Sequence, residues 1–132
     1  MAGYSGTPLP KKLGIKEQYR VAFIDMPADI KSELKEALAA CKIAAKGPLD
    51  YVHLFVKSQA DLEKTLVRFR PQLAPAGMIW VSWPKKSSGV ETDVTENDVR
   101  RVGLAVGVVD VKVCAVNEIW SGLKFVIRVK DR

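Results

Sequence analysis

Residues 51–83 read YVHLFVKSQADLEKTLVRFRPQLAPAGMIWVSW, with two apolar runs on either side of an amphipathic stretch. The runs at 51–56 and 78–83 are short and nearly continuous, as in strands that are covered on both faces. Between them, behind a capping signal at Ser58, apolar residues recur at helical spacing, namely Leu62, Leu66, Phe69 and Leu73. This stretch therefore predicts a strand, a helix and a second strand, with a loop at 74–77 before the second strand.

The pattern continues toward the N-terminus. An apolar run at 20–25 predicts a first strand, and Pro27 opens a helical pattern that extends to Cys41. Residues 42–45 indicate a short edge strand. Residues 1–18 are rich in Gly, Pro and Lys, which predicts an irregular lead-in with a turn at 10–14. We therefore expect a lead-in over residues 1–18 and a single Rossmann-like domain over residues 19–132.

The C-terminal part predicts one more helix and two paired strands. A capping signal at Thr95 opens a helix that ends at Gly107. Apolar residues alternate over 109–115 and again over 123–129, which predicts an antiparallel hairpin with a bulge at 121–122. The alternation of strands and helices predicts a three-layer α/β/α Rossmann-like fold, with a mostly parallel sheet and a C-terminal antiparallel hairpin.

The composition is that of one globular domain. The chain has 132 residues, 48% of them hydrophobic and 27% charged, so it can bury a core without a disulfide or a metal. Cys41 and Cys114 are both flanked by aliphatic residues, which predicts small buried hydrophobic side chains. No CxxC motif or Cys/His cluster occurs, so we expect neither a metal site nor a redox site.

Targeting signals are not apparent in the sequence. The N-terminus has no apolar stretch typical of a signal peptide, and no apolar run is long enough to span a bilayer. We therefore expect a soluble, cytoplasmic protein with no membrane partner.

The net charge of +6 comes from the two ends of the chain. Basic residues exceed acidic ones in 1–20 and in 119–132, and the two kinds balance between these segments. If the ends lay side by side, they would form a positive patch that attracts nucleic acid or acidic partners. Because no RNA-binding motif or helix-turn-helix accompanies this charge, solvated termini are the preferred interpretation, and weak nucleic-acid binding is an alternative.

The sequence also resembles two known groups of proteins. The order of elements from residue 51 to the terminal hairpin resembles the second half of a class I methyltransferase fold. Four motifs, GYSGTP at 3–8, KKLGI at 11–15, WPKKSSGV at 83–90 and EIWSGL at 118–123, resemble a largely bacterial family catalogued only as a domain of unknown function. The second resemblance covers nearly the whole chain. It implies the fold and a cytoplasmic setting, and it transfers no catalytic residues.

The turn after the first strand bears on cofactor binding. Class I methyltransferases cradle their cofactor on a glycine-rich turn there, because the backbone must approach the ligand closely. In this chain the turn reads DMPAD over 25–29, without glycine, and Pro27 removes a backbone donor. Neither GxGxxG nor a P-loop occurs. We therefore expect no cofactor: neither a methyl donor nor a dinucleotide fits in the usual pose.

The main candidate site is the loop after the strand at 78–83. It leaves the sheet at the carboxyl edge, where open α/β sheets bind ligands. Its two ammonium groups, two hydroxyl groups and flexible glycine could hold a phosphate or a carboxylate, and they belong to Lys85, Lys86, Ser87, Ser88 and Gly89. The helix that begins at Thr95 could add backbone N–H groups and the positive end of its dipole. An exposed polar connection is the alternative.

Other candidate residues have a preferred structural role. Asp25 ends the first strand at the same edge and could accept bonds from ribose hydroxyls, but capping the next helix is preferred. Trp83 could stack on a planar ligand, although tryptophans close to strands are more often core residues. His53 shares a strand face with Tyr51 and Phe55, which favours a packed, hydrogen-bonded core histidine. As the single histidine, it supports no catalytic triad or Cys–His pair.

These observations favour a non-catalytic, cytoplasmic accessory or regulatory module with an anion pocket at the carboxyl edge of the sheet. One alternative is a small methyltransferase-like enzyme with a degenerate cofactor site, and another is weak nucleic-acid binding through the basic termini. The sequence predicts neither catalytic residues nor a protein partner.

Overall fold

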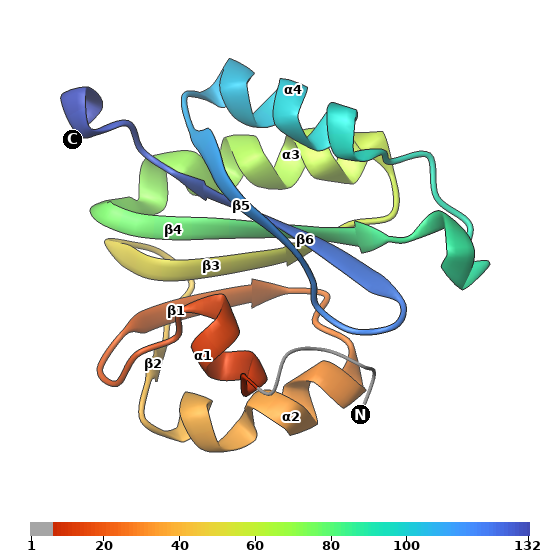
Figure 1. Cartoon of the computed structure of the whole chain (residues 1–132). Helices are drawn as coiled ribbons and strands as arrows, with labels where there is room; N and C mark the ends of the chain where they lie inside the picture. The colour runs from red at the N-terminus through yellow and green to blue at the C-terminus, as the bar shows by residue number, and fades with distance from the viewer. Residues whose placement is uncertain (1–6) are drawn as a thin grey trace.

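The computed structural model describes residues 7–132, so residues 1–6 of the predicted lead-in lie outside the described residues. The elements follow in the order α1 (Leu9–Leu13), β1 (Arg20–Ile24), α2 (Ala28–Ala39), β2 (Lys42–Ile43), β3 (Leu49–Phe55), α3 (Gln59–Phe69), η1 (Arg70–Gln72), β4 (Leu73–Pro84), η2 (Lys86–Ser88), α4 (Glu96–Val106), β5 (Val109–Ala115), β6 (Trp120–Val126) and η3 (Val129–Asp131). Figure 1 labels the helices and strands.

The strands form one sheet in the order β2-β1-β3-β4-β6-β5. The strands β2, β1, β3 and β4 run parallel, and β6 runs antiparallel to both β4 and β5. This arrangement confirms the predicted mostly parallel sheet with a C-terminal antiparallel hairpin. The chain steps outward from β1 to β2 on one side and from β3 to β4 on the other. The junction of β1 and β3 is therefore the topological switch point, where sheets of this kind bind ligands.

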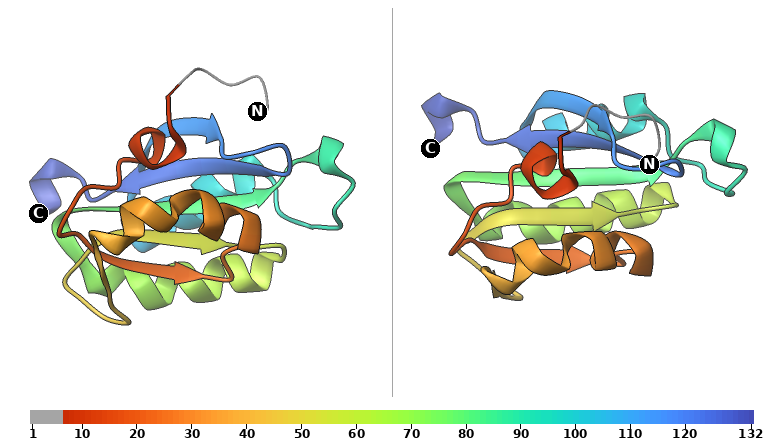
Figure 2. Two further views of the ribbon diagram at one scale, coloured as in Figure 1. Left: turned by 90° about the horizontal axis from the view of Figure 1, so that it is seen from below. Right: turned by 60° about the horizontal axis from the view of Figure 1, so that its bottom comes forward.

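Helices cover both faces of the sheet (Figure 2), and the two faces are built from different side chains. The core under α3 and α4 is largely aliphatic, whereas the core under α1 and α2 holds most of the buried aromatic residues. On the second face Phe23, His53, Trp80 and Lys124 are register partners in a row that crosses β1, β3, β4 and β6.

The segment that was predicted to be irregular contains α1 at Leu9–Leu13. Leu9 and Leu13 are buried in the core of the α1/α2 face, and the indole Nε1 of Trp80 donates a 2.8 Å hydrogen bond to the carbonyl of Leu13. The helix is too short for its apolar pattern to stand out among the neighbouring lysines and prolines, so the sequence indicated only a turn. This part of the lead-in belongs to the core.

Two local predictions were wrong. Strand β4 begins at Leu73, which pairs with Leu49 of β3, so the predicted loop at 74–77 lies inside the strand, where the register with β3 shifts. The predicted bulge at 121–122 is also absent, since that segment pairs regularly with β4, and the register shift lies between Asp110 and Lys112 of β5. Gly122 serves a different purpose. A Cβ there would lie 3.2 Å from the indole of Trp80, so glycine lets β6 approach that ring.

Cys41 and Cys114 are only partly buried, contrary to the prediction that both are core residues. Cys41 follows the end of α2, and Cys114 lies on the edge strand β5, so solvent reaches both positions. Within residues 7–132, no helix combines the length and apolar character that a membrane span needs.

Candidate functional site

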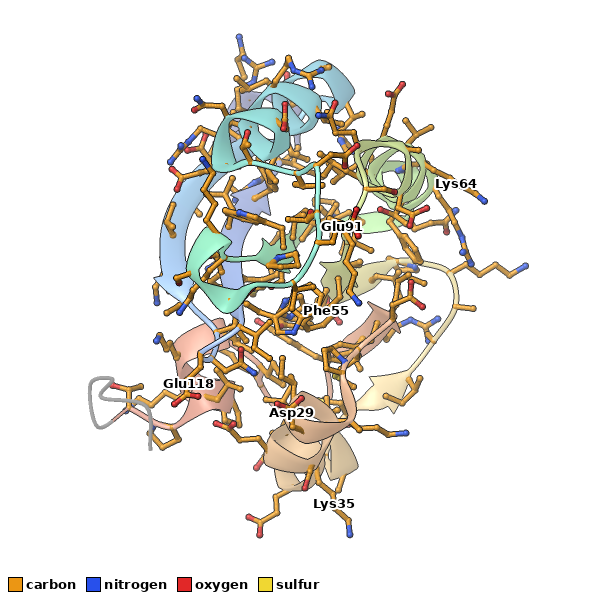
Figure 3. The ribbon with its side chains drawn as sticks, turned by 90° about the vertical axis from the view of Figure 1, so that its right-hand side faces the viewer. Asp29, Lys35, Phe55, Lys64, Glu91 and Glu118 are labelled. Carbon is orange, nitrogen blue, oxygen red and sulfur yellow. The ribbon has the colours of Figure 1, made fainter. Side chains whose placement is uncertain are left out.

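A pocket of about 430 Å³ opens at the carboxyl edge of the sheet, above the ends of β1 and β3. Figure 3 looks onto this edge, with Phe55 near its centre and Asp29 below it. The pocket lining comes from five separate parts of the chain and consists of Asp25, Pro27, Asp29, Phe55, Lys57, Asp61, Val90, Ile119 and Trp120. Its position coincides with the switch point of the sheet, and its volume falls in the range of small-molecule sites.

Phe55 and the residues around it form a rigid aromatic floor. The Phe55 ring stacks on His53 with 4.2 Å between ring centroids, and it meets Trp120 edge-on at 5.3 Å. His53 is fixed in turn by two buried partners, with 2.9 Å between its Nδ1 and the Tyr51 hydroxyl and 2.7 Å between its Nε2 and the Ser82 hydroxyl. These contacts confirm the predicted core histidine. Burial lowers the pKa of His53 from 6.5 to about 3, so its ring is neutral at pH 7.

The rim of the pocket carries three carboxylates and one ammonium group. Asp25 follows β1 in a left-handed conformation with φ of 56°, which aspartate tolerates better than most residues and which turns the chain toward α2. Asp29 lies in the first turn of α2 and Asp61 in the first turn of α3, while Lys57 follows β3. Within residues 7–132 the side chains of Asp25, Lys57 and Asp61 have no hydrogen-bond partner. An excess of uncommitted negative charge therefore faces the opening.

The far wall of the pocket belongs to the turn between β5 and β6. The side-chain oxygen of Asn117 accepts hydrogen bonds from the backbone N–H groups of Ile119 and Trp120, at 2.9 and 2.8 Å. The amide nitrogen of Asn117 also donates to Asp29 across the pocket, at 3.3 Å. Lys85 braces this turn with its backbone N–H on the carbonyl of Ile119 and its ammonium group on the carbonyl of Asn117, both at 2.8 Å.

The loop that was predicted to bind an anion uses its polar groups internally. Besides the bond from the Lys85 ammonium group, the Ser88 hydroxyl donates to the carbonyl of Lys85 at 2.6 Å and accepts from the N–H of Val90 at 3.1 Å. Lys86, Ser87 and Gly89 are exposed. None of the five predicted residues lines the pocket between β1 and β3.

The helix start near this loop already holds a carboxylate of the protein. Thr95 and Asp98 form a capping box at α4, and hydrogen bonds from Thr95 hold the pKa of Asp98 below its usual value. At α3, the N–H of Gln59 donates to the Asp93 carboxylate at 2.8 Å. An external anion would have to displace these groups. Anion binding through Lys85–Gly89 and Thr95 stays a prediction without geometric support.

Asp25 does not have the role that the sequence favoured, whereas Trp83 does. Asp25 does not cap α2, whose N-cap is Pro27 without a side-chain hydrogen bond, and it lines the pocket instead. Trp83 has the preferred role of a core residue: it is buried under α3 and α4 and does not line the pocket. Sequence reasoning missed the other residues of the pocket. Phe55 and Lys57 lie where a buried strand ends, and the same signal had drawn attention to Asp25.

Comparisons with known proteins agree with this architecture. A family model described as "Protein of unknown function (DUF3052)" matches residues 10–129. No curated protein matches the sequence. A SAM-dependent methyltransferase from Aquifex aeolicus is similar in structure, with a TM-score of 0.60, 12% identity, and coverage of 87% of this chain and 85% of that chain.

Two further solved structures have the same kind of fold. The Methanococcus jannaschii fibrillarin pre-rRNA processing protein has a TM-score of 0.56 at 12% identity, over 96% of this chain and 71% of its own. A TehB-like SAM-dependent methyltransferase from Corynebacterium glutamicum has a TM-score of 0.57 at 8% identity, over 96% and 90%. These likenesses show a methyltransferase-like Rossmann fold.

Proposed function

We propose a small-molecule-binding function for this chain, which belongs to the DUF3052 family of proteins of unknown function. The protein acts as a cytoplasmic accessory or regulatory module whose ligand occupies the pocket between β1, β3 and the β5–β6 turn. The observation that carries the proposal is the 430 Å³ pocket at the switch point of the sheet, with an aromatic floor and uncommitted carboxylates at its rim.

The lining of the pocket specifies the chemistry of the ligand. Asp25, Asp29 and Asp61 outnumber Lys57, so the pocket attracts positive charge and repels free phosphate. Carboxylates also accept hydrogen bonds from hydroxyl and ammonium groups. Phe55 and Trp120 offer apolar contact for a ring. The ligand that fits is therefore a ring compound that bears a cation, hydroxyl groups or both.

S-adenosyl compounds are the first probes to try. S-adenosylmethionine combines a ring, two ribose hydroxyls and a positively charged sulfonium group, and two of the structural neighbours are named as SAM-dependent methyltransferases. The glycine-free turn at Asp25–Pro27 means that a bound adenosyl compound adopts a pose other than one cradled on backbone N–H groups. Side-chain carboxylates hold the ligand instead, by accepting hydrogen bonds from its hydroxyl groups.

A small enzyme is the second candidate function. The carboxylates of Asp25 and Asp61 have no partner within the described residues and border the pocket, so either could act as a general base toward a bound substrate. The chain's one histidine is already bonded through both ring nitrogens. Conversion of S-adenosylmethionine to S-adenosylhomocysteine by the purified protein, in the presence of a metabolite extract, would favour the enzyme over the binding module.

A thermal-shift panel tests the binding proposal. The panel contains S-adenosylmethionine, S-adenosylhomocysteine and adenosine, with AMP and inorganic phosphate as anionic counterparts. A ligand at 100 times its Kd stabilises the fold by about 2.7 kcal/mol, which raises the Tm by several degrees. We expect the cationic adenosyl compound to give the largest rise.

Two variants locate the binding. The double substitution Asp25→Asn with Asp61→Asn should remove most of the rise, and Glu36→Gln, an exposed change on α2, should leave it intact. A panel without any rise, or one in which phosphate alone stabilises the protein, would contradict the proposal.

A further inference from the structure

Helix α1 lies against the β5–β6 hairpin (Figure 2), and lysines of these two parts of the chain lie close together there. This lysine patch consists of Lys12, Lys16, Lys112 and Lys124. Lys112 and Lys124 are register partners on the neighbouring strands β5 and β6. The ammonium group of Lys112 donates to the carbonyl of Lys12 at 3.1 Å, and that of Lys12 donates to the carbonyl of Ala115 at 2.8 Å.

The patch concentrates charge of one sign. Ammonium groups directly opposite each other on paired strands repel. The four ion pairs among residues 7–132 all involve arginines of other regions, so none neutralises Lys16, Lys112 or Lys124. Burial, together with the nearby charges of Lys112 and Lys16, lowers the pKa of Lys124. Glu17, beside Lys16 in the sequence, is exposed.

The side chains around the patch argue against two ways of binding a partner, namely stacking on a base and insertion of a large apolar anchor. Trp80, which neighbours Lys124 in the row across the sheet, is fully buried, so it cannot stack on a base. Leu13, next to Lys12 in α1, is buried as well, and the exposed apolar side chains on either side of Lys112, Val111 and Val113, are smaller than the aromatic anchors on which protein interfaces usually rely. Lysine ammonium groups suit phosphates as point charges.

From this arrangement we infer that the lysine patch binds the phosphodiester backbone of a nucleic acid, without reading its base sequence. Contacts to phosphates position a nucleic acid and carry no sequence information. The acidic pocket at the carboxyl edge repels the same backbone, so the strand follows the hairpin and stays clear of the pocket. The inference does not depend on the ligand of the pocket.

Fluorescence anisotropy with labelled poly(dT) of about 20 nucleotides and a duplex of similar length tests this inference. If three phosphates are neutralised, raising the salt from about 50 to 200 mM should weaken binding about 20-fold for the single strand and about 40-fold for the duplex. Unrelated sequences should bind equally well. Absence of binding at about 50 mM salt, or a marked preference for one sequence, would overturn it.

A matched pair of double variants locates the surface. Lys112→Gln with Lys124→Gln should weaken binding at least about tenfold and flatten the salt dependence, because about two phosphate contacts are lost. Lys35→Gln with Lys64→Gln removes the same charge from exposed positions on α2 and α3 (Figure 3) and should leave binding unchanged.

Circular-dichroism melts check that both double variants fold. Equal weakening by the two pairs would overturn the inference. So would competition by polyglutamate at the same charge concentration as poly(dT), because that result would assign the patch to acidic proteins.

Discussion

The two faces of the sheet are built for different tasks. Under α3 and α4, aliphatic side chains fill the space with few polar groups, and the helices carry well-formed caps. Under α1 and α2 lie a buried histidine with two polar partners, most of the aromatic rings and the floor of the pocket, and the lysine patch borders the same face. In our proposals, one face mainly provides stability, and the other combines stability with recognition.

Close packing on the α3/α4 face predicts the largest loss of stability. A Cβ at Gly103 of α4 would lie 2.3 Å from the ring of Phe125, which is fully buried. Gly103→Val should therefore destabilise the protein by about 3 kcal/mol or more, measured by urea denaturation. Phe125→Leu in the same chain should recover part of the loss, while Ala105→Val, at an exposed position of α4, should cost less than about 1 kcal/mol. A Gly103→Val protein as stable as the natural one would refute the close packing of this face.

A pair of tryptophan variants compares the two faces directly. Trp80→Phe removes the hydrogen bond to the Leu13 carbonyl, whereas Trp83→Phe makes the same truncation on the α3/α4 face, where the indole has no such bond within the described residues. Trp80→Phe should cost about 1–2 kcal/mol more than Trp83→Phe, because a buried carbonyl loses its partner. Hydrogen exchange should also accelerate in α1 and remain slow in α4. Equal destabilisation by Trp80→Phe and Trp83→Phe would mean that the hydrogen bond from Trp80 to the Leu13 carbonyl does not hold α1 in place.

The buried histidine makes the α1/α2 face sensitive to acid. The pKa of His53 is about 3 in the folded protein and 6.5 when unfolded, so the unfolded state binds the proton first as pH falls. The contribution of neutral His53 to stability is therefore fully present well above pH 6.5 and decreases as pH falls through 6.5 toward 3, with a loss of about 2 kcal/mol between pH 7 and 5. Since His53 is the only histidine, its ring signals in NMR should not titrate in that interval. A midpoint near 6.5 would contradict its burial.

The smallest loss of stability is expected from removal of the Thr95 N-cap of α4, on the α3/α4 face. Thr95→Ala removes the hydroxyl that accepts from the N–H of Asp98 at 3.3 Å, and it should cost about 1 kcal/mol in thermal or urea denaturation. Ser32→Ala, at an exposed position inside α2, serves as the control and should change stability by only a few tenths of a kcal/mol. An unchanged stability on removal of the cap would show that α4 is held by its packing alone.

Local patterns were sufficient for the fold and insufficient for the site. The apolar runs at 51–56 and 78–83 and the capping box at Thr95 are each visible within a few residues, and each appears in the structure. The pocket depends on β1 lying beside β3, because only that strand order brings Asp25 next to Phe55. No short segment of the chain encodes that order.

The lysine loop shows a second limit. Whether Lys85 is available to a ligand depends on the carbonyl of Asn117, which is 32 residues away and belongs to a different turn. The loop was recognised from its composition, and its role as a brace for the pocket wall became visible only with the tertiary contacts. The position of a lysine near the ligand edge therefore does not by itself indicate a site, because its ammonium group can instead bond to a carbonyl that is distant in the sequence.

Electron density for a bound ligand tests the proposed pocket most directly. Crystals would be grown with the panel compound that stabilises the protein most in the thermal-shift measurement. We expect density between the carboxylate of Asp25 and the rings of Phe55 and Trp120, with Lys85 still bonded to Asn117. Density beside Lys85–Gly89 or at the start of α4, with the pocket between β1 and β3 empty, would contradict the proposal.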